Sequence, residues 1–362
     1  MALQKQIIVV GAGIIGASIA WHLTKAGAEV TIVEARNPGG VATPASFAWI
    51  NASWGNPEEY FRLRRRSMAE WKRLAAECPD ILIGWVGGLC WDLPRDKLEA
   101  YASEHASWGY GIRRVDRKEA ARIEPNLSEP PDFALHIAEE GAVEPAAAAQ
   151  ALVADAARRG AKLMERTEVV SLLVGGGEVR GVETMEGRLS ADEVVLAAGI
   201  ETPRLAATAG IDVPLTTSPG LLVHSRPTEK LLNGLVIAGR HMRQTAEGRI
   251  VCGADFGGTE PGADPAGTAR ALFAQMQEML IGGDRLEFER YTIGLRPIPA
   301  DGFPIIGRAD GVVGLYLAVM HSGITLAPAV GLFAAREILD GGREPLVAPY
   351  SLSRFAAAQS SA

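Results

Sequence analysis

Apolar residues near the start of the chain are arranged in an order that predicts a strand, a turn, a helix and a second strand. Residues 7–10 are all apolar, which is typical of a buried strand, and the glycine-rich hexapeptide 11–16 (GAGIIG) follows at once. Apolar residues continue at helical spacing as far as Gly27, and residues 30–33 form a second apolar run that ends at Glu34. The chain is therefore expected to open with a βαβ unit.

Amphipathic helices are predicted next. Residues 37–55 are rich in Gly, Pro, Ser and Asn and predict a loop, after which Asn56 as N-cap and Pro57 are expected to begin a helix that ends near Glu77. Its buried face is predicted to consist of Tyr60, Leu63, Ser67, Trp71 and Leu74. Further helices are predicted at residues 96–108, 116–123 and 145–160.

The second half of the chain is predicted to be mostly sheet. Residues 169–174, 179–184 and 188–196 predict three strands joined by tight turns, and the last strand runs on toward Gly199. Additional strands at 221–225, 234–239 and 249–253, with a helix at 265–281, predict a second sheet with helical cover. A strand at 315–320 and a helix at 325–339 then form a closing strand–turn–helix unit.

Length, charge and cysteines narrow the class of protein. A chain of 362 residues favours two joined domains, because one hydrophobic core rarely serves so many residues. The net charge of −7 argues against nucleic-acid binding, and we interpret the basic cluster of Arg62, Arg64, Arg65 and Arg66 as a solvated helix face. Three cysteines without C-x-x-C spacing favour a cytoplasmic protein without a metal site, and no apolar run approaches the ~20 residues of a membrane span.

The glycines of the opening turn have a specific chemical use. Gly11 permits a sharp exit from the strand, Gly13 lets the backbone approach a pyrophosphate, and Gly16 lets the helix pack close to the strand. Glu34 follows at the distance expected for a carboxylate that binds ribose hydroxyls. A plain βα turn is the alternative, but the order of strand, turn, helix, strand and acid favours a dinucleotide site.

Several other motifs follow this turn in a fixed order: Ala45-Ser46-Phe47, GAVEP at 141–145, 194–199 with PRL at 203–205, GLRP at 294–297, 301–307 and the turn at His321. Together they resemble the flavoprotein family of D-amino-acid oxidases, glycine and sarcosine oxidases and D-amino-acid dehydrogenases. The resemblance implies an α/β fold with a Rossmann-type FAD-binding domain assembled from residues 1–80, 141–215 and 300–362. An inserted substrate domain with a mixed or antiparallel sheet, of α+β type, would comprise 81–140 and 216–299.

The resemblance implies FAD rather than a nicotinamide as cofactor, and it assigns contacts along the chain. Pyrophosphate would be bound by Gly11, Ala12, Gly13, Ile14, Ile15 and Gly16, with Ala45 and Ser46. The adenosine would be bound by Glu34, Ala35 and Arg36. Val169, or the equally apolar Val170, would contact the adenine through its backbone. The flavin would be bordered by Ala198 and Gly199, and its pyrimidine edge reached by the turn that contains Ser322, Gly323, Ile324 and Thr325. Helix N–H groups there would favour the negative charge of reduced flavin, whereas a surface helix cap is the alternative.

Arg296 is the strongest candidate for substrate binding. In similar amino-acid oxidases this arginine binds the substrate carboxylate, which suits the planar, bidentate guanidinium. The alternative is an internal ion pair with an Asp or Glu. Arg243, His241 and Tyr291 are further candidates, with Arg243 in a loop at the cavity mouth or at a solvated hairpin tip, and His321 is either part of the site or a hydrogen-bonded turn residue.

The implied reaction is oxidation of the C–N bond of a small amino or imino acid, such as a D-amino acid, glycine, sarcosine or D-proline. A hydride would pass to flavin N5 and leave an imine that hydrolyses to a keto acid. Three residues depart from patterns within the family. Met320 stands where glycine is usual, and Arg296 stands where sarcosine oxidases have the cysteine that binds flavin covalently. Val251 stands in place of the lysine that activates oxygen in those enzymes.

Three functions are compatible with these residues. The chain is a self-sufficient oxidase or dehydrogenase, or the flavin subunit of a heteromeric amino-acid or opine dehydrogenase, or, less favoured, a nicotinamide-dependent dehydrogenase. The expected partners are a carboxylate-bearing amine as substrate, oxygen, a quinone or a partner protein as electron acceptor, and further subunits of the same or another kind.

Overall fold

The computed structural model describes residues 5–52, 55–255 and 257–359. Its first large sheet has six strands, in the order β19 (Ile305–Arg308), β20 (Leu315–Val319), β13 (Glu193–Leu196), β1 (Gln6–Val10), β2 (Glu29–Val33) and β9 (Lys162–Met164). All neighbours are parallel except β19 and β20. Because parallel strands end at one edge, the segments after β1, β2, β13 and β20 lie together.

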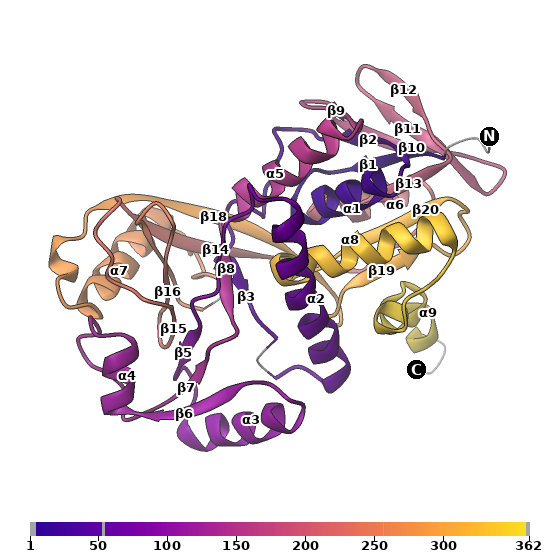
Figure 1. Ribbon diagram of the computed structural model, residues 1–362. Helices are drawn as coiled ribbons and strands as arrows, with labels where there is room; N and C mark the ends of the chain where they lie inside the picture. Colours follow the sequence, from indigo (N-terminus) through magenta and orange to yellow (C-terminus); the bar gives the residue numbers. More distant parts are fainter. Residues whose placement is uncertain (1–4, 53–54, 256, 360–362) are drawn as a thin grey trace.

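The second large sheet has eight strands and is antiparallel except between β15 and β5. Its order is β18 (Phe288–Pro299), β14 (Leu215–Ser225), β17 (Ile250–Gly253), β16 (His241–Gln244), β15 (Leu235–Ile237), β5 (Gly88–Cys90), β7 (Phe133–Ile137) and β6 (Ile112–Asp116). Figure 1 shows the two sheets side by side, with the long strands β14 and β18 extending from one to the other.

Two three-stranded sheets complete the strands. One contains β10 (Val169–Gly175), β11 (Glu178–Thr184) and β12 (Gly187–Ser190), and the other contains β3 (Trp49–Ile50), β8 (Gly141–Val143) and β4 (Ile83–Gly84). The smaller helices are α3 (Arg95–Ser107), α4 (Arg117–Ile123), α6 (Thr202–Ala207), α7 (Pro265–Glu278) and α9 (Ser353–Gln359), with 3₁₀ turns at Gly199–Glu201, Gly283–Arg285 and Pro345–Tyr350.

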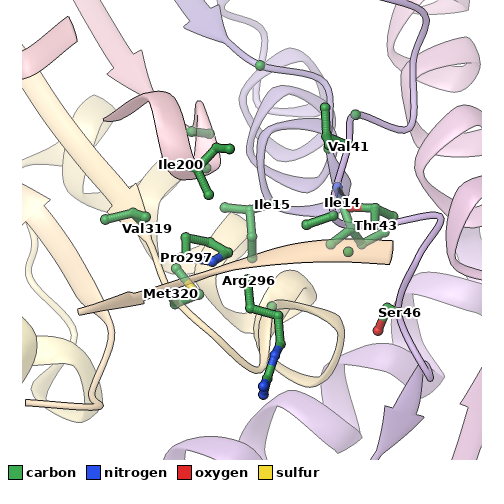
Figure 2. A pocket seen from close by; sticks show the side chains of 18 of the residues that line it. Ile14, Ile15, Val41, Thr43, Ser46, Ile200, Arg296, Pro297, Val319 and Met320 are labelled. Carbon is green, nitrogen blue, oxygen red and sulfur yellow. Dashed lines mark hydrogen bonds between the residues drawn. The ribbon is translucent and has the colours of Figure 1, made fainter. Parts of the chain in front are cut away.

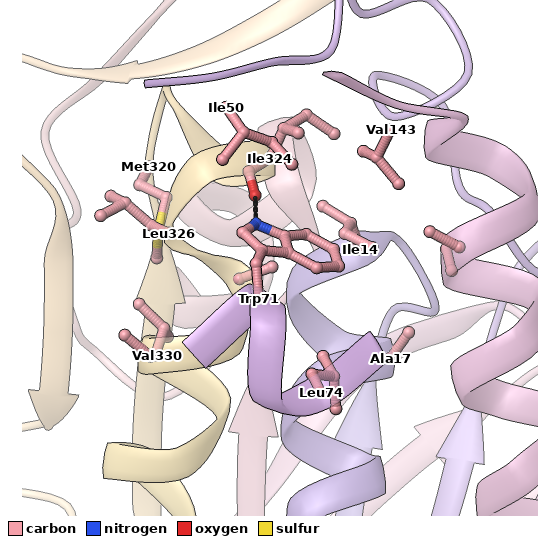
Figure 3. Close-up of a cluster of buried hydrophobic side chains, with 14 of the residues drawn as sticks. Ile14, Ala17, Ile50, Trp71, Leu74, Val143, Met320, Ile324, Leu326 and Val330 are labelled. Atoms are coloured by element: carbon pink, nitrogen blue, oxygen red, sulfur yellow. Dashed lines mark hydrogen bonds between the residues drawn. The ribbon is translucent and has the colours of Figure 1, made fainter. Parts of the chain in front are cut away.

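Four helices build the core beside the six-stranded sheet. They are α1 (Ile14–Lys25), α2 (Glu58–Glu77), α5 (Pro145–Arg158) and α8 (Gly323–Asp340), with α1 packed on both α5 and α8. The predicted stripe of α2 is buried at every position, and Figure 3 shows Trp71 and Leu74 among the apolar side chains of α1 and α8. This packing fixes where α1 and α8 begin.

Helix α2 also completes the hydrogen bonding of α8. Pro328 lies inside α8 and has no N–H, so the Ile324 carbonyl four residues earlier lacks its usual helical donor. The indole Nε1 of Trp71 donates to that carbonyl at 2.8 Å (Figure 3), and Ser67 Oγ accepts from the Ala329 N–H at 3.2 Å. The first turn of α8 is therefore held by α2.

Several sequence predictions need correction. The strand predicted at 188–196 is two strands in different sheets, β12 and β13. No strand was predicted at β3, β4, β6, β7, β8, β16 or the long β18. Pro57, not Asn56, precedes the first residue of α2. The basic cluster is not a uniformly solvated face, because Arg64 is buried.

The three cysteines are free and buried, and among the described residues no helix is long and apolar enough to cross a membrane.

Candidate active site

A cavity of about 610 Å³ lies at the carboxyl-terminal edge of the six-stranded sheet. It is lined by the turn after β1, by the ends of β2, β13 and β20, by the 40–49 loop, and by parts of β14 and β18. Figure 2 shows lining side chains from α1, this loop, β18 and the end of β20 gathered around it. Residues that are distant in sequence therefore meet in one place because the parallel strands end together.

The glycines of the 11–16 turn serve different neighbours. Gly11 has φ +99°, and a Cβ on Gly16 would lie 1.9 Å from the Gly11 carbonyl oxygen. The backbone itself therefore requires glycine at both positions. A Cβ on Gly13 would meet only Thr43 Oγ1, at an ordinary 3.4 Å, although Gly13 lines the cavity. The protein itself does not need glycine at position 13, so the space in front of it fits a bound group.

Glu34 is buried at the end of β2, and backbone donors fix its carboxylate. Oε2 accepts from the Ala12 N–H at 2.7 Å and Oε1 from the Arg36 N–H at 2.9 Å. Ala35 and Arg36 also line the cavity. The carboxylate retains lone pairs that can accept hydroxyl hydrogen bonds, as ribose binding requires.

The middle of the cavity is formed by short segments of the chain. Ala45, Ser46, Val169, Ala198 and Gly199 all line it, whereas Val170 does not. Thr43 was not predicted from the sequence: its Oγ1 accepts from the Ile14 N–H at 3.1 Å and ties the loop to the first residue of α1. No periodicity or motif distinguishes Thr43 from the other small polar residues of this loop.

Helix α8 begins at the far end of the cavity. Ser322 has φ +57° and precedes Gly323, Ile324 and Thr325, all of which line the cavity. These first-turn N–H groups have no partners within an α-helix. Thr325 Oγ1 donates to the Trp49 carbonyl at 3.1 Å and accepts from the Asn51 N–H at 3.3 Å, which fastens the helix to β3. This positive helix end suits an anionic group.

His321 is a hydrogen-bonded neutral imidazole beside this helix. Its Nε2 lies 2.5 Å from the Gly302 carbonyl, which only accepts, so Nε2 carries the proton. Nδ1 then accepts from Ser322 Oγ at 2.9 Å. Burial, followed by the nearby Arg64 guanidinium, lowers the pKa of His321 to about 4. Both ring nitrogens are occupied, which favours the turn-residue alternative over proton transfer.

Arg296 extends from β18 into the cavity (Figure 2). Its Nη2 donates to Ser218 Oγ at 3.1 Å, while Nε is buried without a partner. Within the described parts of the chain no carboxylate oxygen lies within 4.0 Å of this guanidinium, so the ion-pair alternative is not observed. Burial lowers the pKa of Arg296, and the charge of Asp255 partly opposes this shift. Gly257 leaves room for it, because a Cβ there would lie 2.4 Å from Nη1.

The other substrate candidates do not line the cavity. Arg243 lies in β16, not in a loop or at a hairpin tip; it is buried, donating to the Phe47 carbonyl at 2.6 Å and pairing with Glu144 at 3.0 Å. His241 is buried with Nε2 3.6 Å from Asp92, and Tyr291 is 38% exposed on β18. Sequence reasoning missed Arg64, a lining residue whose buried position within a charged run has no local signal.

The arrangement fits FAD. The free space before Gly13, the fixed Glu34 carboxylate and the start of α8 provide places for a pyrophosphate, a ribose and an anionic ring edge within one cavity. Among the described residues, no group of three His, Cys, Asp or Glu side chains could hold a metal ion.

Known proteins match the chain over nearly its whole length. A family model for FAD-dependent oxidoreductases (DAO) matches residues 6–337. Glycine oxidase of Bacillus licheniformis is 30% identical, with 94% of each chain covered. An opine oxidase subunit of Agrobacterium tumefaciens (strain Ach5) is 27% identical, and the match covers 98% of this chain and 99% of that one.

Similarity extends to solved structures. Glycine oxidase from Geobacillus kaustophilus superposes with a TM-score of 0.88 at 27% identity, over 97% of this chain and 99% of that one. The predicted α/β fold and the choice of FAD over a nicotinamide are thereby confirmed. The chain belongs to the DAO family of FAD-dependent oxidoreductases, enzymes that oxidise amino acids.

Proposed function

We propose that the chain oxidises the C–N bond of a small amino or imino acid whose carboxylate binds Arg296. The observation that carries this proposal is the half-buried guanidinium with an unpartnered Nε in the cavity. A half-buried charge that only the nearby Asp255 partly offsets is unfavourable, so a carboxylate ligand would stabilise it. The bidentate geometry of guanidinium and carboxylate would also orient the substrate.

Bound FAD supplies the redox chemistry, accepting a hydride equivalent from the substrate carbon next to nitrogen. The chain's own residues align the substrate and exclude water. Arg296 holds the carboxylate, and the N–H groups at the start of α8 stabilise negative charge at the neighbouring end of the cavity. No general base is needed if the amine binds neutral, which agrees with the fully hydrogen-bonded state of His321.

Replacing Arg296 by methionine tests this assignment. The variant removes a charge-assisted contact of about 3 kcal/mol and should raise KM for a carboxylate substrate by at least ~100-fold. Arg290→Met is the matched control, because Arg290 lies on the same strand, is half exposed and pairs with Glu289. An unchanged KM in Arg296→Met would contradict the proposal.

The chain is also proposed to divide into two domains. We infer that residues 1–80, 141–215 and 300–362 form the FAD-binding domain and that 81–140 and 216–299 form the substrate domain. The distribution of strands between the two large sheets supports this division.

A second candidate is the flavin subunit of a heteromeric dehydrogenase. The similarity to an opine oxidase subunit favours it, as does buried Val251 where oxygen-activating relatives are expected to carry lysine. Under this alternative the isolated chain would reduce its flavin with substrate but reoxidise slowly in air. Rapid aerobic turnover by the isolated chain would instead identify a self-sufficient oxidase.

A further inference from the structure

A second guanidinium, that of Arg64 on α2, lines the same cavity as Arg296. Arg64 is 6% exposed, and in the described parts of the chain no carboxylate oxygen lies within 4.0 Å of it. Its neighbours on the helix differ. Each has a carboxylate partner: Arg62 with Glu58, Arg65 with Glu139 and Arg66 with Glu70. The most buried arginine of the run is therefore the one without a counter-ion.

Neutral acceptors use part of the hydrogen-bonding capacity of Arg64. Nε donates to the Asn51 carbonyl at 3.1 Å, Nη2 to Asn51 Oδ1 at 2.5 Å, and Nη1 to Ser322 Oγ at 3.0 Å. A guanidinium has five N–H groups, so one on each Nη has no acceptor in these three bonds. These contacts orient the side chain, and the Tyr60 ring centroid lies 5.5 Å from the guanidinium carbon, but none of these groups carries a negative charge.

Arg64, Arg296 and His321 come from different elements and all line the cavity. Arg64 reaches Ser322, whose hydroxyl also bonds His321 Nδ1. Both guanidinium groups lower the pKa of His321 through their charge, so both act on this end of the cavity. His321 is neutral and cannot offset either charge. This end of the cavity therefore presents two positive charges, and among the described residues no carboxylate oxygen lies within 4.0 Å of either, although the charge of Asp255 acts on Arg296.

We propose that Arg64 binds a second carboxylate, so that the substrate is an amine bearing two carboxylates. Arg296 binds the carboxylate next to the oxidised C–N bond, and Arg64 binds the carboxylate on the other substituent. This inference rests on the proposed function, because it takes the ligand of Arg296 to be a carboxylate. Iminodiacetate-like or acidic amino acids have the required chemistry, whereas glycine and sarcosine lack the second anion.

Two unreactive thioethers provide a direct test by binding to the holoenzyme. Thiodiglycolate carries two carboxylates and (methylthio)acetate carries one, while neither can be oxidised at a C–N bond. The change in the visible flavin spectrum on titration gives the dissociation constant of each. A charge-assisted contact at Arg64 should make thiodiglycolate bind about 10- to 100-fold more tightly.

Variants assign that preference to a residue. Arg64→Gln should abolish the preference, measured as the ratio of the two dissociation constants, because it removes the proposed contact to the second carboxylate together with the hydrogen bonds to Asn51 and Ser322. Arg62→Gln is the matched control, being exposed on the same helix. If Arg64→Gln does not fold, Arg64→Lys takes its place in the test. It keeps the charge without the planar geometry and should retain part of the preference.

Each result bears on the inference separately from the proposed function. Equal binding of the two thioethers to the wild-type protein would overturn the role of Arg64 while leaving the carboxylate site at Arg296 intact. A preference that persists in Arg64→Gln would also overturn the role of Arg64 and leave the site at Arg296 intact. Failure of both thioethers to bind would overturn the carboxylate site and the second contact together.

Discussion

Two glycines of the same turn, Gly13 and Gly16, are expected to respond differently to a methyl group. In Gly13→Ala the new Cβ meets only Thr43 Oγ1 at 3.4 Å, so folding should be preserved while the pyrophosphate site is obstructed. In Gly16→Ala the Cβ would lie 1.9 Å from the Gly11 carbonyl, and overpacking should cost about 1 to 3 kcal/mol of stability. Thermal unfolding and the flavin content of purified protein measure the two effects.

The opposite pattern would contradict the role given to this turn. Gly13→Ala that folds and retains FAD with unchanged affinity would show that the cofactor does not approach this position. Thr43 also acts on this turn. Its hydroxyl orients the start of α1, although Thr43 appears in no sequence motif.

Gly257 controls the position of Arg296 through close contact. A Cβ at this position would lie 2.4–2.5 Å from the guanidinium, whose flexible end can move, so Gly257→Ala should displace Arg296 without unfolding the protein. We expect KM for a carboxylate substrate to rise at least ~10-fold, consistent with a weakened ionic contact. Steady-state kinetics with unchanged flavin content would confirm this, and wild-type KM would contradict it.

At the scale of elements, the start of α8 depends on α2. Trp71→Phe removes the indole donor from the Ile324 carbonyl and leaves it buried without a partner, which should cost about 1 to 3 kcal/mol. Pro328→Ala restores a backbone N–H at the position from which an α-helix donates to residue 324. In the Pro328→Ala background, Trp71→Phe should therefore cost less, as measured by urea unfolding. Equal costs in both backgrounds would refute this coupling.

Helices and strands could be predicted from the sequence where the spacing of their own apolar residues determined them. The opening βαβ unit and the buried stripe of α2 follow from apolar spacing alone. The break between β12 and β13 does not, because residues 188–196 are compatible with one strand and only the packing assigns the two halves to different sheets. For the same reason the sequence located Arg296 but could not show that Arg64 faces the cavity while Arg62 faces solvent.

At the scale of the whole molecule, buried histidines should make stability depend on pH. Burial lowers the pKa of His22, His105, His224 and His321 from 6.5 to about 4. Between pH 6.5 and 4 the unfolded chain binds more protons than the folded one, so the free energy of unfolding falls as pH falls. The slope can reach about 1.4 kcal/mol per pH unit for each histidine.

Chemical denaturation at several pH values measures this dependence. The free energy of unfolding should have its full value above pH 6.5 and fall toward pH 4. The variant His105→Phe, which lies away from the cavity, should reduce the slope of this dependence. A flat profile across this range would contradict the neutral, buried state of the histidines.

This flavoprotein is proposed to oxidise amines that carry a carboxylate. Anaerobic titration of the purified holoenzyme with amino and imino acids, while the visible flavin absorption is recorded, tests it most directly. The panel contains glycine, sarcosine, D-alanine, D-proline, hydroxyproline and opines, with dimethylamine as the matched control for sarcosine without the carboxylate. We predict bleaching of the flavin band by at least one carboxylate-bearing amine and none by dimethylamine. A flavin that dithionite reduces but that every amino and imino acid leaves oxidised would contradict this proposed activity.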